Sequence, residues 1–154
     1  IENILVVNAD DSAFYPQKVI KNLVNKHLSK KADLTFLTVK MKKPNIARVV
    51  RDRRGKVKQV VEQQNLKAGQ EKIREVNCGC YCFSVEFLKN NLPLVKKNPI
   101  SGEFYITELI EIGIRKKAEV QTCEMNREDY FQSVNTREQL IEADKKMRKK
   151  LAGK

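Results

Sequence analysis

The fold of this chain is decided by the stretch Asn3-Ile4-Leu5-Val6-Val7-Asn8-Ala9-Asp10-Asp11-Ser12, in which an apolar run ends in polar residues. The run is short and rich in β-branched side chains, which predicts a buried strand followed by a turn. The next segment predicts a helix. Pro16 can occupy its first turn, and apolar residues recur at helical spacing as far as Lys30. A second β-rich run covers residues 34–39, so the opening of the chain predicts a βαβ unit and an α/β fold.

The middle of the chain predicts strands. Residues 47–51 and 56–62 are β-type runs joined by a loop of Asp52, two arginines and Gly55, which predicts a hairpin. Residues 75–83 predict a longer strand whose side chains alternate between two faces. One face carries Val76, Cys78, Cys80 and Cys82, and the other carries Asn77, Gly79, Tyr81 and Phe83.

The last third is mainly helical. Residues 85–92 predict a short helix that stops near Pro93, and apolar residues between 106 and 114 mark one face of a longer helix. A strand is expected near residues 120–123, and a charged helix over residues 136–151. We expect residues 1–135 to form the body of the domain and residues 136–154 a basic C-terminal helix or linker.

Length and composition narrow the class of protein. A chain of 154 residues with 41% hydrophobic and 32% charged residues is long enough for one folded domain with a core. No apolar run is long enough to cross a membrane, and no secretory signal pattern opens the chain, so we expect a cytoplasmic protein without a membrane partner. Three of the four cysteines fall between residues 78 and 82, a spacing that favours a reducing compartment over a disulfide framework.

The net charge of +12 favours anionic partners such as nucleotides, phosphorylated sugars, nucleic acid or a membrane surface. Part of the excess lies in the last ten residues. We interpret it as a solvated helix end, because cations near a helix C-terminus oppose the helix dipole. A nucleic-acid-binding arm is the alternative.

Asp10 is the most informative candidate for chemistry, because it follows an apolar strand at the edge of the sheet where ligands gather in open α/β folds. A carboxylate there can hold Mg²⁺, which prefers oxygen ligands and bridges them to substrate phosphates. Asp11 competes for this role, and a turn or helix cap is the alternative for both. We expect the cysteines to be structural, since same-face strand cysteines lie too far apart to converge on one zinc. We expect His27 to be structural as well, because it lies on the apolar stripe of the predicted helix and has no obvious acid or nucleophile partner.

Seven short blocks of the sequence carry a family resemblance. They are residues 4–10, 48–52, 55–57, 60–63, 74–79, 102–108 and 134–140. Taken in order, the series resembles sugar-1-phosphate nucleotidyltransferases, and it most resembles the pyrophosphorylase domain of bifunctional N-acetylglucosamine-1-phosphate uridyltransferases. The resemblance covers nearly the whole chain and implies a partial Rossmann-like (GT-A-like) α/β domain with a mixed sheet and an inserted β-hairpin.

The resemblance also implies a reaction. A sugar 1-phosphate, expected to be N-acetylglucosamine 1-phosphate, attacks the α-phosphorus of a nucleoside triphosphate, expected to be UTP, and pyrophosphate leaves. Such chemistry depends on positioning, Mg²⁺ and charge stabilisation. Asp10 and Asn135 fall on the catalytic metal ligands of the family. The expected sugar-binding residues are Ala47, Glu62, Asn77, Tyr105 and Thr107.

The sequence also departs from the family. Members carry Gly-Tyr-Gly before the hairpin arginine, where this chain has Asn45, Ile46 and Ala47, and they carry a proline two residues after the metal-binding aspartate, where this chain has Ser12. The glycine-rich triphosphate loop that opens the family domain has no counterpart here. We therefore expect the C-terminal portion of the domain, inactive alone, and we expect its partner to be the missing N-terminal half or, in a homo-oligomer, a second copy of the chain.

Two further functions stay open at this level. The first changes the substrates alone, to glucose 1-phosphate or a thymidine nucleotide. The second is a noncatalytic basic module that binds nucleic acid, the less favoured partner, or pairs with another subunit. Salt-dependent binding separates the second from a sugar-nucleotide site, because counterion release makes nucleic-acid affinity fall steeply with ionic strength.

Overall fold

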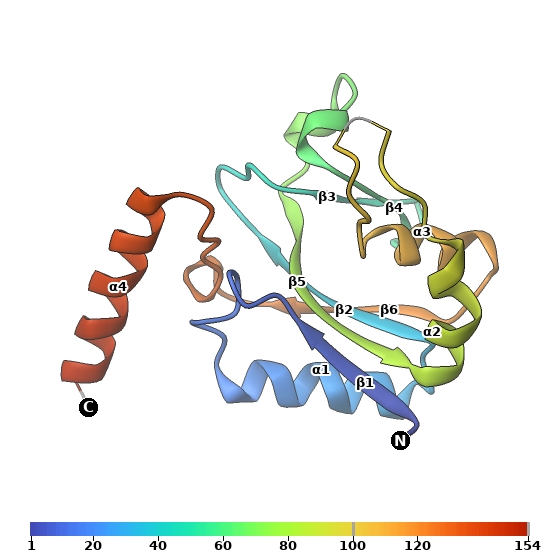
Figure 1. Ribbon diagram of the computed structural model, residues 1–154, viewed down its shortest axis with the longest axis horizontal. Coiled ribbons are helices and arrows are strands. Elements are labelled where there is room, and N and C mark those ends of the chain that lie inside the picture. Colours follow the sequence, from blue (N-terminus) through green and yellow to red (C-terminus); the bar gives the residue numbers. More distant parts are fainter. Residues whose placement is uncertain (100, 154) are drawn as a thin grey trace.

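The computed structural model describes residues 1–99 and 101–153, and a six-stranded mixed β-sheet lies at its centre (Figure 1). Helices cover both faces of the sheet, as the α/β pattern predicts. The strands are β1 (Asn3–Val7), β2 (Leu34–Lys40), β3 (Arg48–Arg51), β4 (Val57–Val61), β5 (Glu75–Ser84) and β6 (Val120–Met125). The α-helices are α1 (Gln17–Ser29), α2 (Val85–Asn91), α3 (Glu108–Arg115) and α4 (Arg137–Ala152).

The long strand β5 organises the sheet. On one side it pairs with β2, which in turn pairs with β6 in parallel. On the other side it pairs with β1 near its C-terminal end and with β3 near its N-terminal end. Both β1 and β2 run antiparallel to β5 and α1 connects them. The predicted βαβ unit is therefore present with an antiparallel strand inserted between its two strands.

The prediction that the first strand is buried is wrong. Ile4, Leu5 and Val7 of β1 are 39%, 42% and 38% exposed. Among the strands of the described residues, β1 pairs with β5 alone, so one of its edges has no strand beside it. An apolar run is buried only where other elements cover it, and that cover comes from distant segments that a local pattern does not report.

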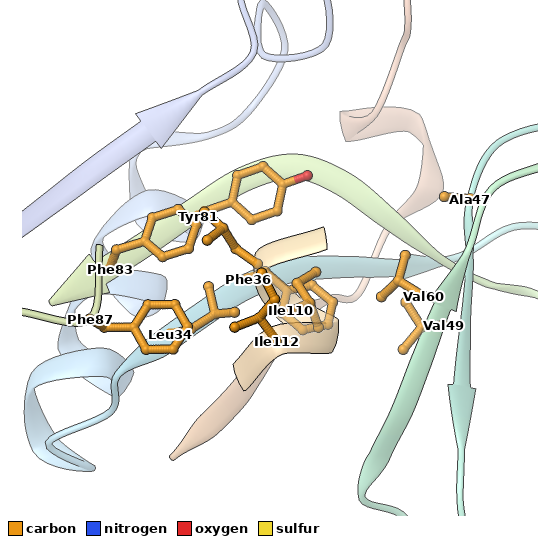
Figure 2. Packing of buried hydrophobic residues seen from close by; sticks show 11 residues of the cluster. Leu34, Phe36, Ala47, Val49, Val60, Tyr81, Phe83, Phe87, Ile110 and Ile112 are labelled. Atoms are coloured by element: carbon orange, nitrogen blue, oxygen red, sulfur yellow. The ribbon is translucent and has the colours of Figure 1, made fainter. Parts of the chain in front are cut away.

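The predicted alternation along β5 is confirmed. Tyr81 and Phe83 pack against α2 and α3 in one cluster, where their rings stack in a row with Phe87 (Figure 2). Cys78 and Cys80 pack with Leu23 of α1 on the opposite face. The cysteines Cys78, Cys80 and Cys82 are buried free thiols, as expected for small core residues.

The last two helices, α3 and α4, lie close to their predicted ranges. The helix expected over 106–114 begins at Glu108, so Ile106 precedes it. In Figure 1, α4 stands beside the sheet, with Ala143 as its buried residue. Thr136 and Gln139 form a reciprocal capping box at its start. None of the helices over the described residues is long and apolar enough to cross a membrane.

Candidate active site

A cavity of about 200 Å³ opens beside the N-terminal half of β5. All five residues expected to bind the sugar line it, although they come from four separate segments of the chain. Its lining residues are Asn8, Asp11, Ile46, Ala47, Glu62, Asn77, Gly79, Tyr81, Tyr105, Ile106, Thr107, Phe131 and Ser133.

Two hydrogen bonds join four polar side chains that line this cavity. Thr107, just before α3, donates from Oγ1 to Oε1 of Glu62, just after β4, at 2.8 Å. On β5, Asn77 donates from Nδ2 to the hydroxyl of Tyr81 at 2.6 Å. In Figure 2 this hydroxyl end of Tyr81 points away from Phe83, toward the side where Ala47 lies. The aromatic row therefore ends in a polar group at the cavity.

Arg48 holds the segment that carries Ala47. Its guanidinium is almost fully buried and donates to the backbone carbonyls of Ile46 and Pro44. The carbonyl of Ala47 accepts from the backbone N–H of Asn77 at 3.1 Å. The segment that lacks the family glycines is thus held by a buried cation, and Ala47 lies at the cavity wall through backbone hydrogen bonding.

The turn after β1 supplies the opposite wall. Asp11 is 8% exposed and accepts a long hydrogen bond of 3.5 Å from Nδ2 of Asn8, whose backbone N–H donates to the carbonyl of Gly79 at 2.8 Å. Burial raises the pKa of Asp11, the charge of Asp10 raises it further, and hydrogen bonds from Ser133 and Asn8 offset part of the effect. Oδ1 of Asp11 and Oδ1 of Asn77 have no hydrogen-bond partner among the described residues.

Asp10 and Asn135 lie outside the cavity lining, and both are exposed. Their backbones meet, because the N–H of Val134 donates to the carbonyl of Asp10 at 3.1 Å. Asn135 donates from Nδ2 to Oγ of Ser133 at 2.6 Å, which leaves its amide oxygen as the group that could coordinate a cation. The segments that carry the two expected metal ligands are therefore distant in the sequence, and their backbones meet at the turn after β1.

Four polar residues of the cavity were not predicted to bind the sugar: Asn8, Asp11, Tyr81 and Ser133. Asn8 and Ser133 carry no sequence signal of this role, and the sequence leaves Asp11 as a rival metal ligand or as a turn or cap residue. Asn8 and Asp11 owe their positions to the turn at residues 8–12, in which the N–H of Asp11 donates to the carbonyl of Asn8 at 3.3 Å. Ser133 comes from the segment whose Val134 N–H donates to the carbonyl of Asp10. Single-sequence periodicity carries no information on which side chain such a turn directs inward.

The chain is similar in sequence to part of the bifunctional protein GlmU. No protein-family model matches the chain. The chain is 31% identical over 148 residues to the bifunctional protein GlmU of Clostridium novyi (strain NT), and 33% identical over 145 residues to that of Carboxydothermus hydrogenoformans. These alignments cover 96% and 94% of the chain and 32% of each relative, so the chain spans about a third of their length.

Solved structures show the same fold. A protein of Bacillus anthracis named as a glucose-1-phosphate thymidylyltransferase superposes with a TM-score of 0.70 and 17% identity, over 92% of this chain and 53% of that one. A nucleoside-diphosphate-sugar pyrophosphorylase from Vibrio cholerae RC9 gives a TM-score of 0.64 and 16% identity, over 92% and 55%. The chain is thus similar in sequence to part of GlmU and has the fold of sugar nucleotidyltransferases, which fits a partial GlmU-like pyrophosphorylase domain.

Proposed function

We propose that the chain supplies the sugar-binding part of a sugar-1-phosphate nucleotidyltransferase whose substrates are N-acetylglucosamine 1-phosphate and UTP. In this reaction a phosphate oxygen of the sugar 1-phosphate attacks the α-phosphorus of the nucleotide. The new P–O bond forms as the bond between the α-phosphorus and the bridging oxygen breaks, and pyrophosphate leaves with that oxygen. The products are a nucleotide sugar and pyrophosphate.

The convergence of Ala47, Glu62, Asn77, Tyr105 and Thr107 on one cavity is the observation that carries the proposal. The resemblance selected these residues without knowledge of their positions in space. They are separated along the chain by as many as sixty positions, and unrelated residues would not be expected to line a common space of about 200 Å³.

The chemistry of the cavity suits a sugar ring more than a phosphate. Glu62 and Asn77 present oxygen acceptors, and Tyr105 adds an aromatic wall. No Lys, Arg or His side chain lines the cavity within the part of the chain that the structure describes, although the protein as a whole carries a net charge of +12. The ring therefore enters the cavity, and the phosphate stays outside it.

Asp10 and Asn135 are the residues that would hold Mg²⁺. A carboxylate and an amide oxygen are hard donors, and both are exposed on adjoining backbone segments, so the donor set fits this cation. When bound, Mg²⁺ would supply charge stabilisation for the nucleotide phosphates. The backbone carbonyl of Asp10 accepts the hydrogen bond from the N–H of Val134 that joins the two segments, so the carboxylate of Asp10 is not needed for that contact.

Binding of the sugar phosphate to the 154-residue chain tests the proposal. We expect N-acetylglucosamine 1-phosphate to shift the side-chain amide signal of Asn77 in a saturable NMR titration, because that amide lies in the cavity wall. Glu62→Ala should weaken the binding about tenfold to a hundredfold, the effect of removing one hydrogen-bonding partner that is charged. Glu71→Ala, in the 3₁₀ turn after β4, is the matched control and should bind as the unmodified chain does.

Two outcomes would contradict the sugar-binding function. Inorganic phosphate could produce the same shifts as the sugar phosphate, which would mean that surface lysines bind the phosphate without reading the sugar. A nucleic-acid oligonucleotide could instead bind tightly and lose affinity steeply with added salt, which would favour the noncatalytic basic module. Glucose 1-phosphate in the same titration separates the two candidate sugars.

The metal site has its own test. Paramagnetic Mn²⁺ in place of Mg²⁺ should broaden the backbone amide signals of residues 9–12 and 133–136 at concentrations that leave the hairpin unaffected. Asp10→Asn should abolish this selective broadening. Uniform broadening over all acidic surface residues, unchanged in the variant, would remove Asp10 and Asn135 from the proposed site.

A further inference from the structure

Two polar atoms in the cavity wall lack a hydrogen-bond partner within residues 1–99 and 101–153. Oδ1 of Asp11 and Oδ1 of Asn77 are buried without a hydrogen bond among the described residues, and each residue is 8% exposed. Both are acceptors, and both line the same cavity from opposite segments of the chain, the turn after β1 and strand β5. A buried polar atom without a partner costs free energy, and a ligand in the cavity that donates to these two oxygens would remove that cost.

The position of Asp11 is built into the backbone. Gly79 has a φ of +59°, and a Cβ there would lie 2.5 Å from Oδ2 of Asp11 and 2.7 Å from Nδ2 of Asn8. The strand therefore carries a glycine in a left-handed conformation where the carboxylate lies against it. Asn8 makes a long contact of 3.5 Å from Nδ2 to the other carboxylate oxygen, Oδ2, so Oδ1 is the oxygen of Asp11 without a partner among the described residues.

We propose that Asp11 is a specificity-determining residue that accepts a hydrogen bond from a hydroxyl group of the sugar ring. This inference rests on the proposed function of the cavity and adds a third polar contact to Glu62 and Asn77. The two adjacent aspartates then have different roles: Asp10 would hold the cation, and Asp11 would bind the sugar. Their positions fit these roles, because Asp10 is exposed on the surface of the turn and Asp11 is buried at the cavity.

The ligand chemistry follows from the donors and acceptors that are available. Oδ1 of Asp11 and Oδ1 of Asn77 require donors, and a sugar ring offers hydroxyl groups on adjacent carbons. A ring that lacks the hydroxyl facing Asp11 would leave the carboxylate oxygen buried and unpaired, so the site should reject it. A sugar with a second acidic group would be rejected as well, because Glu62 and Asp11 both line the cavity.

The test compares sugar 1-phosphates that each lack one ring hydroxyl. We expect one of these deoxy analogues to bind the unmodified chain about tenfold to a hundredfold more weakly than the parent sugar phosphate. In Asp11→Ala the parent should lose the same factor, while that analogue should lose no further affinity. Asp11→Asn, which keeps the shape and the Oδ1 acceptor without the charge, should fall between the two. Asp144→Asn on α4 is the control for a change of charge alone.

The outcomes distinguish the two proposals. If the unmodified chain binds the parent sugar phosphate and both Asp11 variants bind it with unchanged affinity, the role of Asp11 is refuted while the function of the cavity stands. The role is also refuted if every deoxy analogue keeps its penalty in Asp11→Ala. If the unmodified chain shows no saturable binding of any sugar phosphate, the function of the cavity fails, and the role of Asp11 with it.

Discussion

Gly79 and Asp11 lie so close that a methyl group on the glycine would stand 2.5 Å from the carboxylate oxygen Oδ2. Strand β5 and the turn after β1 therefore meet through a residue without a side chain. This contact ties the wall of the cavity to the central strand of the sheet.

The first prediction concerns this glycine. Gly79→Ala should lower the free energy of unfolding by about 2–4 kcal/mol, the sum of a left-handed backbone cost and an overlap with Asp11. Gly69→Ala is the matched control, since Gly69 has a φ of +87° and nothing within 4 Å of its added Cβ. Its loss should be about 1–2 kcal/mol. Urea denaturation of both variants measures the difference, and equal losses would show that the contact with Asp11 adds nothing.

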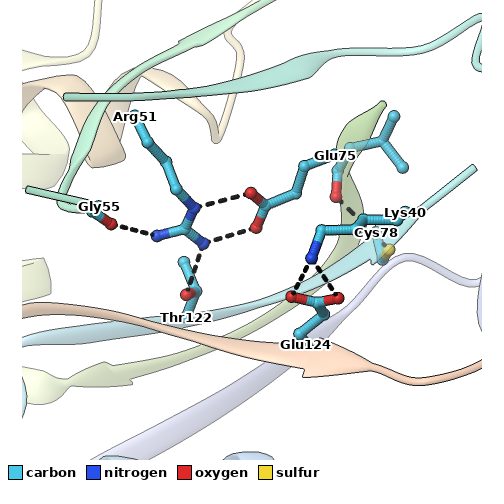
Figure 3. A network of polar contacts seen from close by, with 8 residues as sticks. Lys40, Arg51, Gly55, Glu75, Cys78, Thr122 and Glu124 are labelled. Carbon is cyan, nitrogen blue, oxygen red and sulfur yellow. Dashed lines mark hydrogen bonds and ion pairs between the residues drawn. The ribbon is translucent and has the colours of Figure 1, made fainter. Parts of the chain in front are cut away.

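The second prediction concerns an ion pair that links three strands. Arg51 of β3 donates to both carboxylate oxygens of Glu75, at 2.7 and 2.5 Å, and also to Oγ1 of Thr122 on β6 at 3.0 Å (Figure 3). The side chain of Glu75 is 9% exposed. Glu75→Ala should therefore cost about 2–4 kcal/mol, because it leaves a partly buried guanidinium without its partner.

The exposed pair in the same view provides its control. Lys40 and Glu124 form an ion pair at 3.1 Å, but their side chains are 65% and 45% exposed (Figure 3). Glu124→Ala should cost less than about 1 kcal/mol, since water and salt screen such a pair. If thermal denaturation gives the two variants the same loss, the bidentate geometry of Arg51 contributes no stability.

The elements that the sequence predicts best are those governed by local period. The alternation of β5 follows from residues 75–83 alone, and the hairpin follows from two β-type runs and Gly55. The exposure of β1 could not be predicted this way, because it depends on which strands pair with β5. Contacts between segments far apart in the chain decide such pairing, and they leave no trace in a short window.

The same division holds for the site. The resemblance picked out Glu62, Asn77 and Thr107, whose side chains lie on or beside regular strands and helices. It did not pick out Asp11, because the first block of the resemblance ends at Asp10. Local periodicity could not place Asp11 either, since its carboxylate lies against the left-handed backbone of Gly79 in another strand. Turn geometry is set by tertiary contacts there, so residue type alone left Asp10 and Asp11 as rivals.

His27 gives a prediction of pH dependence. It is 1% exposed and bridges two strands, with Nδ1 3.0 Å from Oγ1 of Thr35 and Nε2 2.9 Å from Oδ1 of Asn3. Burial lowers the pKa of His27, and the charge of Asp33 offsets part of that effect. The unfolded chain then binds a proton more readily than the folded one, so stability is full above pH 6.5 and falls as the pH drops through 6.5 toward the folded pKa.

Urea denaturation between pH 8 and pH 5 measures this effect. The free energy of unfolding should fall on acidification with a slope of at most about 1.4 kcal/mol per pH unit from this group. His27→Gln should remove that contribution over the same range while lowering stability at every pH. An unchanged pH profile in His27→Gln would assign the acid sensitivity to other groups.

The four free cysteines should differ in reactivity, which gives the last prediction. Burial raises the pKa of the Cys78 thiol well above its usual range, and the neighbouring carboxylate of Asp11 raises it further. Burial raises the pKa of Cys80 to about 12, and the thiol of Cys82 adds to this effect. Cys123, on β6, is half-buried, and burial raises its pKa as well, with Lys26 offsetting part of the shift. The thiolate is the reactive form, and access favours Cys123, because Cys78, Cys80 and Cys82 are all buried.

Iodoacetamide labelling of the folded chain at pH 8, followed by peptide mass spectrometry, should therefore modify Cys123 first. Cys78 and Cys80 should react only at the rate at which the sheet opens, and labelling in urea should make all four equivalent.

Cys78→Ser should lower stability, because it places a hydroxyl among the apolar side chains of Leu23 and Leu37. Its binding of sugar phosphate should stay unchanged, since its side chain lies on the face of β5 opposite the cavity. Fast labelling of Cys78 in the folded chain would mean that this face of the sheet opens far more often than its burial implies.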